Sequence, residues 1–383
     1  MNKVNLLGQK RIHQYTDSIF GEDLHAKRVL SLANAVVGCI TVASLAIHTI
    51  GIGLASACGL RSKHAIKQAD RLIGNTGLEL SSLLVRWVQF CVGSREEIIV
   101  TLDWTEFDAD NHSTLALNMV TRHGRATPLM WKTVVKTDLK GRRNDHEDDL
   151  LGQFKDALPP KVAVTVLADR GFGDVKLYKY LQELGFNFII RFREGIQVTD
   201  ASGTTKTAKE WLQGTKARLI KGASVTAQKY SLSGVVVAHA KGMKDAWCLA
   251  VSDPAMKASV AVTTYNKRFT TEENFRDTKD PHFGMGMRQM RIERTDRRDR
   301  LLLVSALSIA LLTLLGAAGE ATGLDAKFKA NTVKTRTHSL FRQGCMYFQC
   351  MVTMRDEWLS PLLEKFESLL IDHAITRDIF GVL

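Results

Sequence analysis

Hydrophobic and polar positions divide the chain into a helical first quarter, a mixed middle and a helical last quarter. Residues 1–95 hold long apolar runs at helical spacing, with turn signals at "GIG", "CGLRS" and "GNTG". From about residue 97 short β-rich runs alternate with helical runs, and beyond residue 300 the pattern is helical to the end. The pattern therefore predicts an α/β core between two helical regions.

The middle of the chain predicts a mixed α/β sheet. Three strands come first, in "EIIVTLDW", "STLALNMVTRHG" and "RATPLMWKTVVK". Two helical segments, "NDHEDDLLGQFKDAL" and "DVKLYKYLQELG", then alternate with the strands "KVAVTVLADRGFG" and "FNFIIRFR", and "AWCLAVSD" is a later strand. Residues 194–245 break this rhythm with short β-like pieces rich in Gly, Thr, Ser and Lys, and we interpret them as an insertion.

Two apolar stretches are compatible with either a bilayer or a buried core. Residues 30–60 contain no Asp, Glu, Lys or Arg, and residues 301–319 are uncharged and long enough to span a membrane. Because the surrounding chain is strongly charged and patterned as globular, we expect both stretches to be buried in the protein. The sequence thus predicts no association with membranes.

Charge indicates the kind of partner. The 383 residues suffice for two or three domains, and they carry a net charge of +12 with a pI of about 9.4. Such a surplus favours a polyanion, either nucleic acid or an anionic membrane surface, over an acidic small molecule. The six cysteines form no C-x-x-C pair and the N-terminal segment lacks the apolar core of a secretion signal. We therefore expect a cytoplasmic protein without a zinc site.

The segment "SKHAIKQADRLIGN", residues 62–75, predicts a helix with one basic face. Lys63, Lys67 and Arg71 recur every four residues, with Ser62 as the expected N-cap and Gly74 at the expected stop. Such a helix after a Gly-containing turn fits the second helix of a helix-turn-helix, and an ordinary surface helix is the alternative. The basic stretches at 288–300 and 140–143 are likewise either DNA contacts or solvated surface.

Two aspartates stand where apolar strands stop. Asp103 closes "EIIVTLD" and Asp169 closes "KVAVTVLAD". Each one alone is more often a turn or cap residue, but two on neighbouring strands together with a Glu on a following helix can hold two divalent ions roughly 3.5–4 Å apart. Mg²⁺ suits such oxygen ligands, and this arrangement serves attack on phosphodiesters.

The segment "YNKRFTTEENFRDTK", residues 265–279, is the expected source of that Glu. Its Tyr265, Arg268, Glu272 and Lys279 fall within about 60° of one face of a helix. Phosphates along a DNA strand, with a metal ion between them, can be recognised by such a row, and a surface helix of mixed charge is the alternative. Helical spacing alone does not choose between Glu272 and Glu273.

These motifs together resemble the DDE transposases of bacterial insertion sequences, specifically the family named after insertion sequence four. Its signature, Y-x2-R-x3-E-x6-K, matches residues 265–279 at every spacing, and "TLDWTEF" and "LADRGFG" match its two Asp motifs. The segment at 62–75 resembles the subgroup related to the tetracycline-resistance transposon. The resemblance implies an RNase H-like catalytic core with a β-rich insertion, and Asp103, Asp169 and Glu272 as catalytic ligands of Mg²⁺, with Mn²⁺ as a substitute.

The resemblance also implies DNA contacts. Tyr265, Arg268 and Lys279 would contact phosphates near the transposon end. Trp247 would stack on a base that flips out when the DNA end forms a hairpin, and packing in the core is its alternative role. Trp211, on the insertion, is a weaker candidate.

The sequence therefore predicts a DNA transposase of fold class α/β. Its expected parts are a helical DNA-binding domain at 1–95, the RNase H-like core at 96–285 and a helical C-terminal region at 286–383. Because two transposon ends are cut together, we expect a homodimer on DNA that meets through the apolar segment "FRQGCMYFQCMV". A metal-dependent DNA nuclease without strand transfer and a catalytically inactive DNA-binding regulator are the alternatives.

Overall fold

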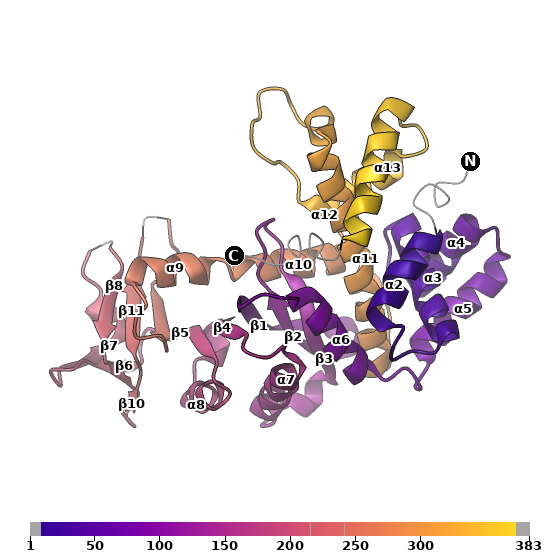
Figure 1. Ribbon diagram of the computed structural model, residues 1–383. Helices are drawn as coiled ribbons and strands as arrows, with labels where there is room; N and C mark the ends of the chain where they lie inside the picture. Colours follow the sequence, from indigo (N-terminus) through magenta and orange to yellow (C-terminus); the bar gives the residue numbers. More distant parts are fainter. Residues whose placement is uncertain (1–8, 215, 241, 373–383) are drawn as a thin grey trace.

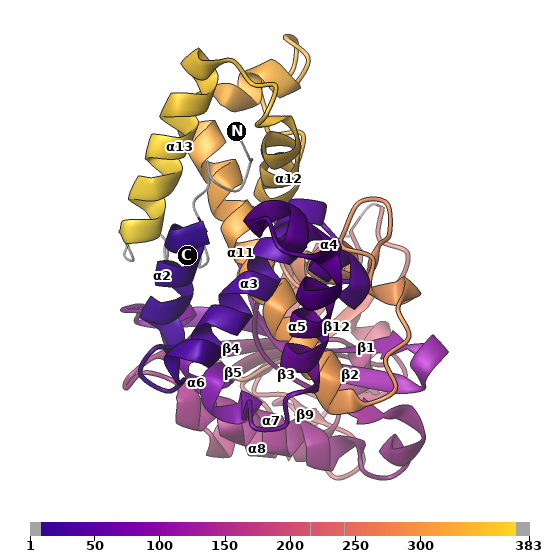
Figure 2. The same ribbon diagram turned by 90° about the vertical axis from the view of Figure 1, so that its right-hand side faces the viewer.

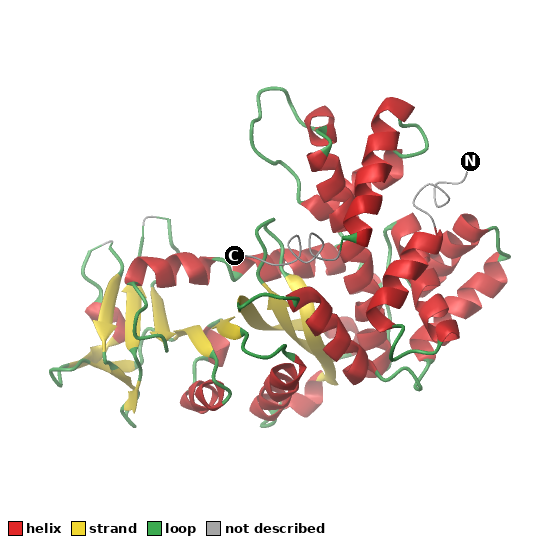
Figure 3. Cartoon of the chain, viewed as in Figure 1, coloured by secondary structure: helices red, strands yellow, loops and turns green. Residues whose placement is uncertain are grey.

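The computed structural model describes residues 9–372, except for residues 215 and 241. Figure 1 shows a helical N-terminal part, a central sheet and a pair of C-terminal helices that project away from the junction between them. Coloured by secondary structure, the same view separates the all-helical ends from the strands (Figure 3). The α/β core between two helical regions is thus confirmed.

Helices alone make up the described part of the N-terminal region. They are α2 (Gln9–Phe20), α3 (Ala26–Val42), α4 (Ile47–Cys58), α5 (Ser62–Gly74) and α6 (Leu80–Val92). α3 and α4 meet at a bend of 93°. α4 approaches α5 closely, because a Cβ atom added to Gly51 would lie 2.4 Å from the Cα atom of Ile66. α5 ends at Gly74 as predicted, but Arg61 takes the N-cap position that we expected for Ser62.

The core of the middle part is an eight-stranded sheet in the order β3-β2-β1-β4-β5-β12-β11-β8. Its strands are β1 (Glu97–Phe107), β2 (His112–Met119), β3 (Thr127–Val135), β4 (Ala163–Ala168), β5 (Asn187–Phe192), β8 (Arg218–Lys221), β11 (Gly234–Ala238) and β12 (Trp247–Val251). β4 is parallel to both β1 and β5, and the other pairs are antiparallel. The six strands predicted outside residues 194–245 are all present.

Residues 194–245 only partly form a separate unit. A small second sheet contains β6 (Gln197–Thr199), β7 (Thr205–Thr207), β9 (Ser224–Val225) and β10 (Tyr230–Ser231). The other two strands of this stretch, β8 and β11, instead extend the main sheet beyond β12. The reason is visible in β11, whose sequence "GVVVA" is buried along its whole length and therefore needs cover on both faces.

Helices lie on both sides of the main sheet. α7 (Arg143–Ala157) and α8 (Val175–Glu183) lie below the strands in Figure 1, and α9 (Ala258–Asn266) and α10 (Phe269–Lys279) lie above them. α7 and α8 match the two predicted helices. Since α9 and α10 follow β12 directly, the chain crosses the top of the sheet from the small sheet back towards β1.

A long helix, α11 (Thr295–Ala321), joins all three parts, and Figure 2 shows it between the N-terminal helices and α12. Among the described residues it is the one helix long and apolar enough to cross a membrane, and the bent pair α3–α4 would pass the same test as a single span. The most apolar window of α11 is 89% buried inside the protein, as expected of a core helix.

The C-terminal helices are α12 (Leu340–Cys350) and α13 (Asp356–Ile371). α12 carries most of "FRQGCMYFQCMV", the segment expected to form the dimer contact, but its apolar residues are buried inside the protomer. Phe341, Cys345, Tyr347 and Phe348 all belong to the hydrophobic core. α12 also packs backbone to backbone on α11, since a Cβ atom at Gly344 would lie 1.8 Å from the carbonyl oxygen of Leu312. The apolar face of α12 is therefore not the dimer surface that we expected.

Candidate active site

The parallel pairing of β1 with β4 brings two carboxylates together. Leu102 of β1 pairs with Ala168 of β4, so the residues that follow them, Asp103 and Asp169, lie next to each other in the register. Asp103 is still within β1, whereas Asp169 lies just beyond the end of β4 and accepts a 2.7 Å hydrogen bond from the backbone N–H of Gly171. The sequence predicted this neighbourhood correctly from two strand ends.

The signature segment is not one continuous helix. α9 ends at Asn266 and α10 begins at Phe269, and the turn between them has hydrogen bonds from the N–H of Lys267 to Thr264 and from the N–H of Arg268 to Tyr265. These bonds span three residues rather than four and so wind the chain more tightly. Across this turn the signature residues differ in burial. Tyr265 is 2% exposed, whereas the side chain of Glu272 is 52% exposed. The expected row of four side chains on one exposed face is therefore not present.

Arg268 links the helix to the strand. Its Nη1 lies 3.4 Å from Oδ2 of Asp103, and its Nη2 donates a 2.7 Å hydrogen bond to Oε1 of Glu272. The side chain is nearly buried, with the residue 8% exposed. Glu273 instead forms an ion pair with Arg125, at 3.3 Å. Of the two glutamates that helical spacing left open, Glu272 is therefore the one connected to Asp103.

The electrostatics of the three acids suit a cation. Burial raises the pKa of Asp103 to about 6. The charge of Arg268 lowers this pKa, whereas the negative charges of Asp169 and Glu272 raise it further. Among the described residues, no group of three His, Cys, Asp or Glu side chains lies close enough to hold a metal ion. The guanidinium of Arg268 is thus the cation between Asp103 and Glu272, and the acids fit a hard divalent ion in chemistry only after Glu272 leaves Arg268.

Lys279 lies at the far end of α10 against the end of β1. Its Nζ donates hydrogen bonds to Oγ1 of Thr105 at 3.0 Å and to the carbonyl oxygen of Glu106 at 2.8 Å. It also lies 4.7 Å from the ring centroid of Phe107. Burial lowers the pKa of Lys279. A hollow of about 380 Å³ opens beside it, and Arg288 lines this hollow too.

Three aromatic rings surround the guanidinium side of this site. Trp247, on β12, is 8% exposed, and its ring centroid lies 4.9 Å from that of Tyr265 and 6.3 Å from that of Phe269. Phe269 is the exposed ring, at 43%, and the guanidinium of Arg268 lies 5.1 Å from its centroid. Sequence reasoning missed Phe269, although an apolar residue beside Arg268 on a polar helix was a usable signal. Trp211 is buried and donates from Nε1 to the carbonyl oxygen of Val198.

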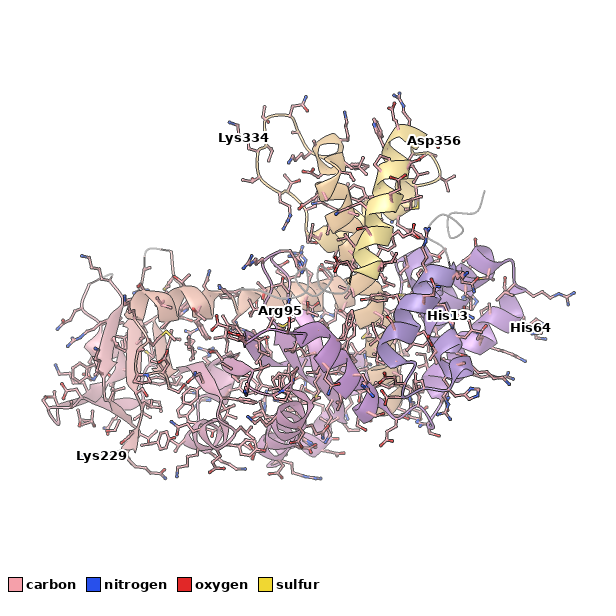
Figure 4. All side chains as sticks on the ribbon, in the orientation of Figure 1. His13, His64, Arg95, Lys229, Lys334 and Asp356 are labelled. Atoms are coloured by element: carbon pink, nitrogen blue, oxygen red, sulfur yellow. The ribbon has the colours of Figure 1, made fainter. Side chains whose placement is uncertain are left out.

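The predicted basic face is present on α5. Lys63, Lys67 and Arg71 are all exposed. A hollow of about 610 Å³ between α3 and α5 is lined by Lys67 and Arg71 and by two further basic side chains, Arg28 and His64. Figure 4 labels His64 at the outer edge of the N-terminal helices, far from the small sheet.

The other two basic stretches are mostly engaged within the protein. Arg298 is buried and forms an ion pair with Asp110, and Arg300 forms one with Asp296 at 3.0 Å. In the 140–143 stretch, the guanidinium of Arg143 lies 5.1 Å from the ring centroid of Trp104. For these arginines the structure favours internal packing and ion pairs over DNA contact.

A family model described as the transposase DDE domain matches residues 96–311, which is more than half of the chain. No curated protein matched the chain. The matched range begins one residue before β1 and ends within α11, so it contains the main sheet, the small sheet and α10. The large mixed sheet with flanking helices is consistent with the RNase H-like core of such transposases, which act on DNA and generally use divalent metal ions. The chain belongs to the transposase DDE domain family.

Proposed function

We propose that the protein is a DNA transposase that cleaves the ends of its own element and joins them to target DNA. The observation that carries this proposal is the meeting of Asp103 and Asp169 in the β1–β4 register, with Glu272 tied to Asp103 through Arg268. The spacing of Tyr265, Arg268, Glu272 and Lys279 supports membership of the insertion sequence four family, in the subgroup related to the tetracycline-resistance transposon.

Asp103, Asp169 and Glu272 are the proposed catalytic ligands of two Mg²⁺ ions, for which Mn²⁺ would substitute. When bound, such ions activate the attacking oxygen and stabilise the leaving oxygen of an in-line displacement at phosphorus. To take part, Glu272 exchanges its 2.7 Å contact with Arg268 for a position beside the two aspartates. The same exchange frees the guanidinium of Arg268 to bind a phosphate through two parallel hydrogen bonds.

The remaining signature residues would contact the DNA end. Lys279 lies at the mouth of a hollow, where its charge can reach a phosphate if it releases Thr105. The hydroxyl of Tyr265 is buried beside Arg268 and would follow that side chain. Phe269 has the exposed ring face, so we propose that it meets an unstacked base first. Trp247 lies directly behind Phe269 and would stack on the base only after Phe269 moves.

The proposed route uses one set of carboxylates for every step. Water attacks the phosphodiester at the element's end and the 3′-hydroxyl leaves. That hydroxyl then attacks the opposite strand to form a hairpin, water opens the hairpin, and the 3′-hydroxyl finally attacks target DNA. Each step is an in-line displacement at phosphorus, so the same groups serve throughout.

The regions outside the core would bind DNA and a second protomer. We propose that residues 1–95 bind DNA through Lys63, Lys67 and Arg71, and that two protomers meet on the DNA through the region 286–383. Because the apolar face of α12 is buried against α11, exposed residues of this region have to make the contact. Val352 and Ile371, on and beside α13, are exposed apolar residues there.

Supplying pre-cut element ends and a supercoiled plasmid tests the function. We expect joined product in the presence of Mg²⁺, and we expect Asp103→Ala to abolish it. Glu273→Gln is the matched control, since Glu273 neighbours Glu272 but pairs with Arg125, and it should keep most of the activity. Cleavage without joining would identify a nuclease, and DNA binding without metal-dependent cleavage would identify an inactive regulator.

A further inference from the structure

The face with which α10 packs on the sheet is polar. Its buried residues are Thr271, Asn274, Asp277 and Thr278. The two phenylalanines of α10 both stay at least partly exposed. Most helices are attached to a sheet by a stripe of apolar side chains. The helix that carries Glu272 is instead attached by hydrogen bonds and one ion pair.

The two ends of this contact are tightly bonded, and its middle is not. At one end the hydroxyls of Thr271 and Thr101 share a hydrogen bond, and Thr101 lies two residues before Asp103 on β1. At the other end Asp277 accepts a 2.7 Å hydrogen bond from Nε of Arg125. Between them, Nδ2 of Asn274 lies 3.5 Å from Oδ1 of Asn118, which is long for a hydrogen bond.

Unpartnered polar atoms surround a small cavity at this middle point. Nδ2 of Asn118, Oδ1 of Asn274 and Oγ of Ser305 are buried and have no hydrogen-bond partner among the described residues. All three side chains line a cavity of about 30 Å³ between α10, α11 and the sheet. A buried amide group without a partner costs about 1–3 kcal/mol. A water molecule needs roughly 10–15 Å³, so the cavity has room for about two.

We propose that water fills this cavity and that Asn118 and Asn274 are positioning residues for Glu272. The asparagines and the water form a hydrated joint, on which α10 shifts so that Glu272 leaves Arg268 and reaches Asp103 and Asp169. Interdigitated apolar side chains would resist such a shift, whereas water-mediated hydrogen bonds exchange easily. Glu272 lies between Thr271 and Asn274 in the chain, so it moves with the joint. The inference rests on the metal-ligand role proposed for Glu272.

The double variant Asn118→Leu with Asn274→Leu tests the joint, because it replaces both polar partners with apolar groups of similar size. In the full-length protein without DNA, we expect Mn²⁺ to bind about tenfold or more weakly than in the unchanged protein. Amide hydrogens of α10 should exchange more slowly, and the melting temperature should not fall. Asn118→Ser with Asn274→Ser keeps the cavity polar, and we expect it to retain Mn²⁺ affinity within about threefold.

Unchanged Mn²⁺ affinity and unchanged exchange in the leucine variant would overturn the proposal. If the leucine variant does not fold, the unchanged protein decides, since its α10 amides should exchange faster than those of α11 and should become protected when Mn²⁺ binds. Equal protection of both helices, with or without Mn²⁺, would also overturn it. Asp103→Ala separates the two proposals. Mn²⁺ binding that survives this change would remove the metal site itself, whereas failure to join DNA ends would leave the joint intact.

Discussion

At the scale of single residues, Arg268 determines the state of the site. Carboxylates at close range repel one another, and a buried acid without a cation tends to take up a proton, as the raised pKa of Asp103 indicates. The guanidinium offsets that repulsion while it occupies the place between Asp103 and Glu272. It is therefore both a support for the acids and a competitor for any metal ion.

Removing this competitor should strengthen metal binding and weaken catalysis. We expect Arg268→Ala to bind Mn²⁺ about tenfold more tightly in the absence of DNA, which corresponds to about 1.4 kcal/mol, close to one charged hydrogen bond. DNA cleavage should fall, because a phosphate contact is lost. Calorimetric titration measures the first effect. Arg276→Ala, on the exposed side of α10, is the control that should change neither. Weaker Mn²⁺ binding in Arg268→Ala would mean that support outweighs competition.

A second buried acid, Glu147, should make stability depend on pH. Its Oε1 accepts a 2.8 Å hydrogen bond from Nε1 of Trp104, and burial raises its pKa from 4.5 to about 7. The folded protein thus holds this proton more tightly than the unfolded chain does. The resulting stabilisation is fully present below pH 4.5 and is lost as the pH rises through about 7.

Glu147→Gln removes this dependence while its amide oxygen can still accept from Trp104. We expect the variant to be more stable than the unchanged protein at pH 8.5, by about 1–3 kcal/mol, and nearly equal to it at pH 5. Urea unfolding at the two pH values measures the difference. Glu183→Gln, at an exposed position of α8, should show no such crossover. A constant difference between Glu147→Gln and the unchanged protein across this range would contradict the assigned cause.

At the scale of elements, the contact between α11 and α12 depends on glycine. A Cβ atom at Gly344 would lie 1.8 Å from the carbonyl oxygen of Leu312, which is backbone and cannot turn aside. We therefore expect Gly344→Ala to lower the free energy of unfolding by about 3 kcal/mol. Gly152→Ala in α7 would meet only the flexible end of Tyr180, so it should be nearly neutral or slightly stabilising. Chemical denaturation compares the two, and equal stability of both variants would contradict the close packing.

The elements of the core were predictable because their side chains alternate or repeat in one period. β1 and β4 end close to where their apolar runs end, so Asp103 and Asp169 could be placed side by side from the sequence. Short runs carry no such information about their partners. Nothing in "GVVVA" indicates that β11 pairs with β12 in the main sheet rather than with the small sheet.

The contacts of the candidate site were less predictable than its membership. Signature spacing identified Glu272, but the ion pair of Arg268 with Asp103 joins residues 165 positions apart and depends on how α10 lies on the sheet. Likewise, the burial of Trp247 follows from Tyr265 and Phe269 packing over it, which a pattern along the chain does not encode. The dimer expectation for α12 was wrong for a similar reason, since an apolar helix face does not indicate whether a partner or the same chain covers it.

At the scale of the whole molecule, the described chain is elongated. The helices with the basic face lie at one end, the small sheet lies at the other, and α10 lies between them (Figures 1 and 4). A DNA end bound at the basic face would therefore have to run along the molecule to reach Asp103. This layout allows the two DNA contacts to be separated experimentally, because binding charge and catalytic charge are far apart in the chain and on different elements.

Neutralising the basic face should change the salt dependence of DNA binding in a counted way. Each phosphate contact adds about 0.9 to the slope of log affinity against log salt, so the triple variant Lys63→Ala, Lys67→Ala, Arg71→Ala should lower the slope by up to about 2.7. Fluorescence anisotropy with a labelled duplex at several salt concentrations measures this slope.

The matched control removes three exposed lysines at the opposite end of the molecule, Lys206, Lys221 and Lys229. Figure 4 labels Lys229 at that end. Both triple variants change the net charge by the same amount, so a long-range effect of charge alone would lower the two slopes equally. A lower slope only for the α5 variant identifies local phosphate contacts, and equal slopes would show that α5 is an ordinary surface helix.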